Sequence, residues 1–142
     1  MADPATSSAA PPLIRVSRFD LERLERLLEK VGPRPELERL RDELDRAEVI
    51  EPSDMPPNVV TMNSRIRFAD EETGEESEIS LVFPRHADTE QGRISILAPV
   101  GTALLGLSVG ATIEWPVPEG RTRRLRVVAI AYQPEAAGDT HL

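Results

Sequence analysis

The chain has 142 residues, of which 39% are hydrophobic and 30% are charged, and its formal net charge is −8. This length suits one domain, or one domain with an appendage. Proteins that bind nucleic acid through its phosphates are normally basic, so the acidic balance argues against direct nucleic-acid binding and suits a basic protein partner better. The chain has no cysteine, which excludes disulfides and thiolate metal sites.

The N-terminal stretch "MADPATSSAAPP" carries no basic region ahead of an apolar segment, so it does not have the pattern of a secretory signal. Its small residues and prolines are typical of a disordered tail, which we expect over residues 1–12. The sequence has no apolar run of the about 20 residues that cross a bilayer. We therefore expect a cytoplasmic protein that does not bind membranes.

Two short amphipathic helices are predicted after this tail. In "FDLERLERLLEKV", residues 19–31, apolar residues recur at steps of three and four. The same pattern predicts a second helix from Glu36 to Glu48. The connection "GPRP", which is Gly32, Pro33, Arg34 and Pro35, leaves the helices room only to fold back on each other. Residues 13–50 thus predict an antiparallel helical hairpin whose arms are about 18 Å long.

Beyond the linker "EPSDMPP", residues 51–57, the hydrophobic period changes to two, which predicts strands. The predicted strands are residues 62–68, 79–83, 93–97, 112–117 and 123–132. The acidic stretch "DEETGEESE" turns the chain between the first two strands, and "PEG" at 118–120 turns it between the last two. One short helix is predicted from Pro99 to Gly106. Residues 51–142 thus predict an antiparallel sheet with one helix, and the whole chain an α+β fold.

No pattern in the sequence requires catalysis or a cofactor. Gly101 and Gly106 have the spacing of a phosphate-binding loop, but Leu107 stands where its lysine is required. The six carboxylates of the acidic stretch lack the spacing of a calcium loop and fit a solvated turn. The two histidines, His86 and His141, are not accompanied by the three or four ligands that zinc needs, so we expect both at the surface. We expect no cofactor and no bound metal.

Three blocks of the sequence resemble the GreA/GreB family of transcription elongation factors: residues 48–68, 94–120 and 125–139. Within them, "MPPNVVTMNS" and "YQPEAAGD" are similar to the short-armed Rnk branch, the regulators of nucleoside diphosphate kinase. The resemblance runs from about Leu13 to the C-terminus. It implies an N-terminal antiparallel coiled coil followed by an FKBP-like domain, in agreement with the predicted elements.

The resemblance also implies a partner, RNA polymerase. In the family, the FKBP-like domain docks on the rim of the polymerase secondary channel and the coiled coil points into it. Members that stimulate transcript cleavage carry acidic residues at the tip of long arms. Here the arms are less than half as long, and Gly32–Pro35 contains no acidic pair. We therefore expect a monomeric, non-enzymatic regulator that occupies the channel without stimulating cleavage and competes with the long-armed members.

The family's docking loop lies just before the short helix, with an acidic residue or Asn, then Ser, then Pro. Leu97, Ala98 and Pro99 occupy these positions, so only the proline matches, and we expect docking through Leu97–Val100. Two alternatives remain open. The first is an FKBP-like peptidyl-prolyl isomerase, which would need an aromatic-lined pocket, whereas most aromatic residues are predicted in the core. The second is an adapter unrelated to polymerase, with the leucine-rich hairpin as a helical ligand for a groove.

Overall fold

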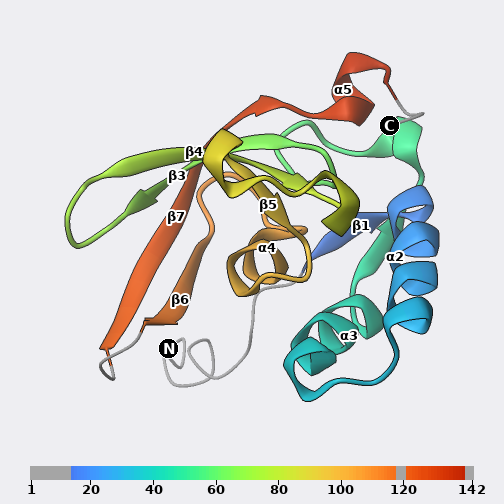
Figure 1. The fold of residues 1–142 in the computed structure, drawn as a ribbon. Coiled ribbons are helices and arrows are strands. Elements are labelled where there is room, and N and C mark those ends of the chain that lie inside the picture. The colour runs from blue at the N-terminus through green and yellow to red at the C-terminus, as the bar shows by residue number, and fades with distance from the viewer. Residues whose placement is uncertain (1–13, 118–120, 140–142) are drawn as a thin grey trace, which may run out of the picture.

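The computed structural model describes residues 14–117 and 121–139, arranged as in Figure 1. The predicted tail at 1–12, the predicted turn at 118–120 and His141 lie outside these residues. The α-helices are α2 (Arg18–Val31), α3 (Glu38–Asp45), α4 (Pro99–Leu104) and α5 (Pro134–Ala137). The strands are β1 (Arg15–Ser17), β2 (Glu48–Ile50), β3 (Arg65–Asp70), β4 (Glu76–Val82), β5 (Arg93–Ser95), β6 (Thr112–Val117) and β7 (Arg121–Tyr132).

The main sheet has the strand order β5-β4-β3-β7-β6 and curls over α4, so the predicted mixed α+β architecture is confirmed. The prediction that the sheet is wholly antiparallel is wrong at one edge, because β5 pairs with β4 in parallel. Two short 3-10 turns, Pro84–His86 and Thr89–Gln91, occupy the connection between these strands. They turn the chain so that β5 starts opposite Ser80 and runs beside the last residues of β4, which a polar loop of this length does not reveal in the sequence.

Helix α4 lies close against the edge of the sheet, and Gly101 makes this approach possible. A Cβ atom at Gly101 would lie 2.3 Å from the carbonyl oxygen of Ser95, closer than two such atoms can approach. The helix begins with Pro99, whose missing N–H costs nothing at that position. Gly106 follows its end with a φ of +81°, so the predicted short helix between Pro99 and Gly106 is confirmed.

The first helix is confirmed, and the second is shorter than predicted. Ser17 caps α2 by accepting a hydrogen bond from the amide of Asp20 at 3.0 Å, and Gly32 ends it with a φ of +79°. The predicted helix from Glu36 to Glu48 is instead a 3-10 turn, Pro35–Leu37, followed by the eight residues of α3. Glu48 belongs to β2, because its amide donates to the carbonyl of Ile14 at 2.9 Å and pairing with β1 replaces another helical turn.

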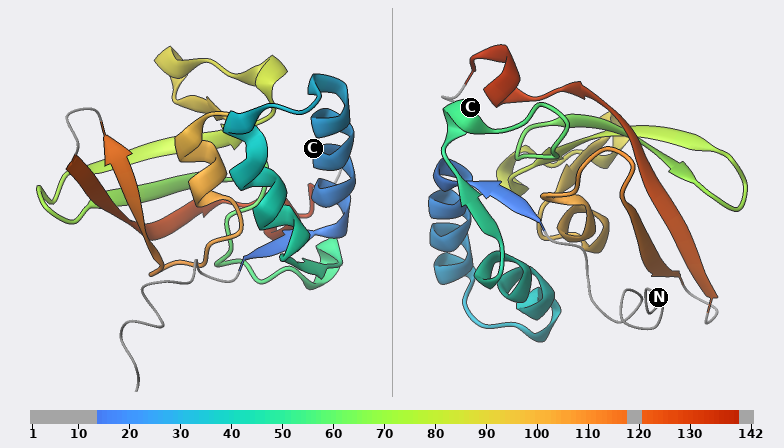
Figure 2. Two further views of the ribbon diagram at one scale, coloured as in Figure 1. Left: turned by 90° about the horizontal axis from the view of Figure 1, so that it is seen from below. Right: turned by 180° about the vertical axis from the view of Figure 1, so that it is seen from behind.

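The short parallel pair β1–β2 joins the hairpin to the rest of the molecule. Neither strand is predicted from the sequence, because three residues are too few for a period to be recognised. The buried side chains of the hairpin and of the sheet form one continuous cluster. It includes Leu24 and Leu28 of α2, Leu40 of α3, and Ile66 and Leu81 of the sheet. The two turned views in Figure 2 agree that α2 and α3 lie beside the sheet.

The segment 51–57, predicted as a linker, is held in place by the C-terminal part of the chain. The side-chain amide of Gln133 donates at 2.8 Å to the carbonyl oxygens of Pro56 and Val59. Gln133 also caps α5, a single helical turn that the sequence analysis did not predict. This turn therefore fixes the entry into the sheet.

Candidate functional site

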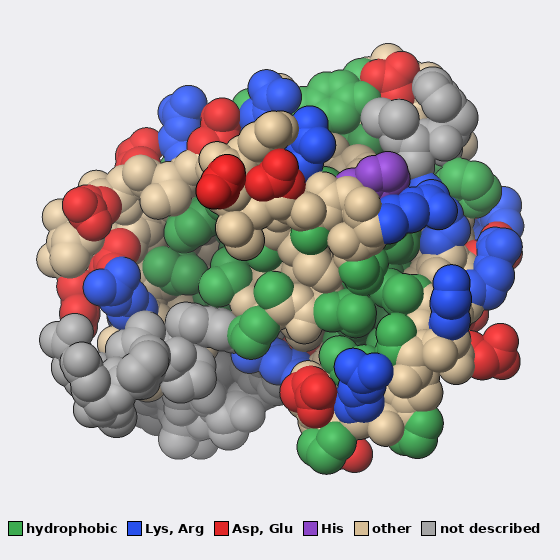
Figure 3. Space-filling view, viewed as in Figure 1, with side chains coloured by type: hydrophobic (Ala, Val, Ile, Leu, Met, Phe, Trp, Pro, Cys, Tyr) green, Lys and Arg blue, Asp and Glu red, His purple; other side chains and the backbone are tan. Residues whose placement is uncertain are grey.

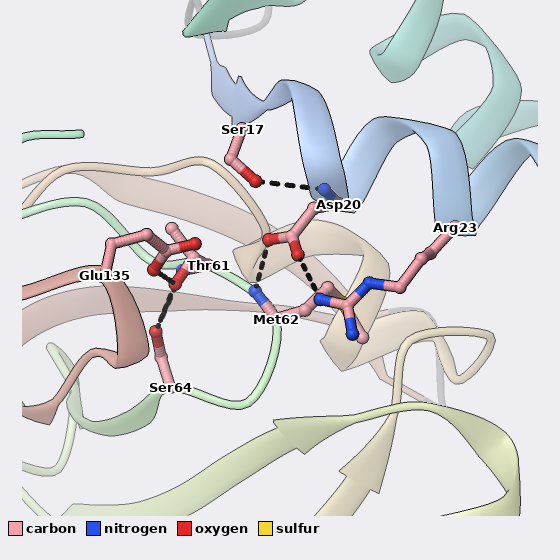
Figure 4. A network of polar contacts seen from close by, with 7 residues as sticks. All are labelled: Ser17, Asp20, Arg23, Thr61, Met62, Ser64 and Glu135. Atoms are coloured by element: carbon pink, nitrogen blue, oxygen red, sulfur yellow. Dashed lines mark hydrogen bonds and ion pairs between the residues drawn. The ribbon is translucent and has the colours of Figure 1, made fainter. Parts of the chain in front are cut away.

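A buried carboxylate joins α2 to the body of the protein, as Figure 4 shows. Asp20 lies in the first turn of α2 and is only 1% exposed. Its Oδ2 accepts a hydrogen bond from the amide of Met62 at 3.1 Å, and its Oδ1 accepts one from Nη2 of Arg23 at 2.6 Å. Burial raises the pKa of Asp20, while the bonds from Arg23 and Met62 act in the opposite direction. The carboxylate thus fixes the start of α2 relative to the loop that precedes β3.

The same contact orients Arg23 at the surface. Its guanidinium lies 4.9 Å from the ring centroids of both Phe19 and Phe83, the range of a cation–π contact. Phe19 belongs to α2, whereas Phe83 follows the end of β4. Arg23 therefore connects the helix to the sheet on one side of the molecule.

The second half of the network in Figure 4 lies on the other side of Met62. The hydroxyl of Thr61 donates to Oε1 of Glu135 at 2.8 Å and lies 2.9 Å from the hydroxyl of Ser64. Burial raises the pKa of Glu135, and the hydrogen bond from Thr61 partly offsets this effect. Both halves hold the segment before β3. We assign them a structural role.

A groove of about 700 Å³ runs between α2 and the segments that follow β4 and β5. We call it the α2–β4 groove. Its floor is apolar and consists of Leu27, Val31, Phe83, Pro84 and Leu97. Four of these, all but the proline, pack against the buried cluster of the protein. The floor is therefore an outer extension of the core and does not depend on a mobile loop.

The rim of the α2–β4 groove is cationic. The groove is lined by five basic side chains and, among the described residues, by no carboxylate; the five are Arg23, Arg26, Lys30, Arg34 and Arg85. On the face shown in Figure 3, hydrophobic side chains gather in the middle and Lys and Arg side chains border them on the right. A chain with a net charge of −8 thus concentrates positive charge around one apolar hollow.

The residues predicted for docking lie at and beside this groove. Leu97 forms part of the floor, and Pro99 is exposed at the start of α4. Ala98 and Val100 are half-buried. The amide of Leu97 donates to the hydroxyl of Ser95 at 3.0 Å, which holds the loop in one shape.

The predicted hairpin tip reaches the same groove through Arg34, while Pro33 and Pro35 are exposed. Arg41 of α3 donates hydrogen bonds to the carbonyl oxygens of Leu28 and Gly32 at 3.2 and 3.0 Å. It thus supplies a donor for carbonyl groups at the C-terminal end of α2. The structure thus brings a residue of the tip and a residue of the docking loop together, although 63 positions separate Arg34 from Leu97.

The basic residues of α2 are not among the predicted site residues. Arg23, Arg26 and Lys30 recur at steps of three and four, which places them on one stripe of the helix beside Leu27 and Val31. This spacing is a usable signal, although it equally fits the solvated face of an amphipathic helix. The contribution of Phe83 and Arg85 could not be read from the sequence, because it depends on how the sheet packs against α2.

Some carboxylates of the acidic turn between β3 and β4 lie close to arginines. Asp70 lies 3.4 Å from Arg123, and Glu71 lies 3.3 Å from Arg126. No group of three His, Cys, Asp or Glu side chains that could hold a metal ion occurs in the described part of the chain. His86 is exposed and accepts a hydrogen bond from Arg85. Within the described ranges, no helix is long and apolar enough to cross a membrane.

Comparison with known proteins assigns the chain to a family. The model of the GreA/GreB transcription elongation factor C-terminal region matches residues 55–132, and the model of the Rnk N-terminus matches residues 12–50. The regulator of nucleoside diphosphate kinase of Escherichia coli K12 is 44% identical over 130 residues, covering 90% of this chain and 96% of that protein. The transcription elongation factor GreA of Thermodesulfovibrio yellowstonii is 37% identical over 97 residues, 68% of this chain and 61% of that protein.

A solved structure supports the same assignment. The prokaryotic transcription elongation factor GreA/GreB from Nitrosomonas europaea is 51% identical and superimposes with a TM-score of 0.73. The match covers 85% of this chain and 99% of that chain. Both the helical hairpin and the curled sheet therefore have counterparts among known relatives, and the chain belongs to the GreA/GreB transcription elongation factor family, in its Rnk branch.

Proposed function

We propose that this protein is a non-enzymatic transcription regulator that binds RNA polymerase at its secondary channel and does not stimulate transcript cleavage. Membership of the GreA/GreB family supports the partner, since relatives in that family are named transcription elongation factors. Acting on polymerase, the protein would work in the cytoplasm. The E. coli relative is named for regulation of nucleoside diphosphate kinase, and an effect of that kind would follow indirectly from altered transcription.

The shape and charge of the hairpin tip support the absence of cleavage stimulation. Helix α2 has 14 residues, which gives an arm of about 21 Å. The turn Gly32–Pro35 carries Arg34 and no carboxylate. A magnesium ion in the polymerase active site would need a carboxylate oxygen at about 2.0–2.1 Å, and this turn has none to offer.

The proposal is tested on backtracked transcription complexes assembled with bacterial core RNA polymerase. We expect the protein to leave the rate of transcript cleavage unchanged when added alone. In excess, it should reduce the acceleration caused by GreA, because both would occupy one site. Acceleration by this protein itself, or an undiminished response to GreA, would refute the proposal.

The docking loop is tested by Pro99→Asp. Pro99 is exposed at the first position of α4, where an acidic residue is favourable, so the fold should persist. A carboxylate placed in the centre of an interface should weaken polymerase binding by about tenfold, or 1.4 kcal/mol. Pro52→Asp, at the first position of the 3-10 turn Pro52–Asp54, is the matched control and should bind normally. Equal affinity of the two variants would exclude this loop as the docking surface.

The isomerase alternative gains no support from the α2–β4 groove. Among the described residues that line it, Phe83 is the one aromatic side chain, and the guanidinium of Arg23 lies over that ring at 4.9 Å. A substrate proline could not stack on Phe83 without displacing Arg23. We therefore retain the regulator as the single proposed function.

A further inference from the structure

Within the described ranges, four of the five basic side chains of the α2–β4 groove have no acidic partner, whereas the fifth, Arg23, pairs with Asp20. Elsewhere, Arg18 pairs with Glu51 at 2.8 Å and Arg124 pairs with Glu114 at 3.2 Å. Among the described residues, no such ion pair is formed by the four outer cations of the groove, which are Arg26, Lys30, Arg34 and Arg85. In an acidic chain, carboxylates are abundant. Their exclusion from this rim leaves a positive site available to another molecule.

Helix α2 separates its charges into two stripes. A different hollow of the surface is lined by Glu22, Glu25 and Glu29. The groove is lined by Arg23 and Lys30, and Arg26 lines both hollows. The apolar pair Leu27 and Val31 lies along the cationic stripe. The helix therefore presents to the groove a combination of positive charge and apolar surface, bordered by negative charge on its other side.

The groove wall is preorganised. Arg23 is held by Asp20 at 2.6 Å and covers the ring of Phe83. The floor side chains Leu27 and Leu97 pack on the buried cluster. A ligand would therefore meet a largely preformed site and lose less free energy to ordering.

The dimensions favour an extended or helical protein segment over a small anion. Within α2 the cationic stripe runs from Arg23 to Lys30, seven positions or about 10 Å along the helix, and Arg34 extends it beyond the helix end. Charges spread along a line do not converge on one phosphate, and an inorganic anion would leave the apolar floor uncovered. A nucleic-acid strand would cover it poorly too, and would meet the carboxylates of the neighbouring stripe and a net charge of −8.

We propose that the α2–β4 groove binds an acidic, amphipathic segment of a partner protein. Apolar side chains of the segment occupy the floor formed by Leu27, Val31 and Phe83, and its carboxylates pair with Arg26, Lys30 and the other rim cations. This is the helix-in-groove mode of recognition, in which apolar anchors recur at helical spacing. The proposal concerns the chemistry of the occupant and holds whether or not the partner is polymerase.

The experiment is a selection of peptides of about 12 residues, which as a helix are about 18 Å long and exceed the helical part of the stripe, from a random display library on the immobilised full chain. We expect the enriched peptides to combine Asp or Glu with Leu, Phe or Trp at steps of three and four. Synthetic copies should bind in fluorescence anisotropy and weaken as salt is raised from about 0.05 to about 0.5 M. Their binding should shift NMR signals of α2 and of Phe83–Arg85.

A double variant, Arg26→Gln with Lys30→Gln, tests the assignment of the site. Both side chains are exposed in α2, and Gln is a good helix former, so the fold should persist. The variant should bind the selected peptides about tenfold more weakly. The matched control, Arg65→Gln with Arg93→Gln, removes the same charge from exposed strand positions outside the groove and should bind normally.

Several results would overturn the proposal: no enrichment, enrichment of basic or uncharged peptides, or equal binding by the two double variants. Displacement of a selected peptide by inorganic phosphate would identify a small-anion site instead. Displacement by a single-stranded oligonucleotide of matched charge would identify a nucleic-acid site. Because none of these measurements contains polymerase, their failure is distinguishable from failure of the proposed function.

Discussion

Replacing Asp20 by alanine should loosen α2 from the body of the protein. The substitution leaves the buried amide of Met62 without its acceptor, which costs about 1–3 kcal/mol. It also removes the partner of Arg23, whose side chain is 24% exposed and so regains only part of its hydration. Relief of the desolvation of the Asp20 carboxylate offsets some of this loss. The sum is a destabilisation of about 2–4 kcal/mol.

In thermal unfolding monitored by circular dichroism, this loss should lower the melting temperature of Asp20→Ala by about 4–16 °C, at about 2–4 °C for each kcal/mol. Glu22→Ala is the matched control, because Glu22 lies on the same helix and forms an exposed pair with Arg18 at 3.1 Å. It should change stability by less than about 0.5–1 kcal/mol. If Asp20→Ala and Glu22→Ala melt together, the buried carboxylate does not hold α2, and the reasoning is wrong.

Two further predictions concern packing and pH. Gly101→Ala should destabilise the protein in urea unfolding by about 1–3 kcal/mol, because the new Cβ would lie 2.3 Å from the oxygen of Ser95; Gly74→Ala has open space at a φ of +77° and should cost only about 1 kcal/mol. Equal costs would contradict the steric argument. Burial raises the pKa values of Asp20 and Glu135 in the folded state above their values in the unfolded state. The folded state therefore binds protons more tightly, and protonation of these groups adds to the free energy of unfolding. This added stability is lost as the pH rises through the folded-state pKa values. The free energy of unfolding of the wild type should therefore increase relative to Asp20→Asn as the pH falls from neutral toward the ordinary aspartate pKa of 3.8, and a constant difference would refute the effect.

Local patterns in the sequence predict those elements whose structure depends on local interactions. Helix α2 follows from its apolar spacing and the Ser17 cap, and α4 follows from Pro99 and Gly106. The end of the second helix could not be predicted, because Glu48 leaves the helix to pair with a strand more than 30 positions earlier. Non-local pairing of this kind overrides helix propensity and leaves no local trace.

The candidate site, like the fold, could be predicted from the sequence only where it depends on local patterns. The docking loop and the turn Gly32–Pro35 were identified from the family resemblance, but nothing in the sequence indicated that Arg34 and Leu97 line one groove. The net charge of −8 suggested a basic partner. The structure reveals a local concentration of the opposite sign, because a net charge does not describe how charges are distributed over a surface.

The parallel pair β1–β2 forms the base of the helical hairpin, and this position allows the length of the hairpin arms to vary. Both ends of the hairpin are anchored there, with Arg15 opposite Glu48 and Ser17 opposite Ile50. The turn Gly32–Pro35 lies at the other extreme, with its prolines in solvent. Inserting about seven residues on each side of it, two helical turns per arm, would preserve the facing of the two helices. The β1–β2 pair can therefore support arms of different length, and grafting a longer tip onto this chain should change its reach while leaving this pair intact.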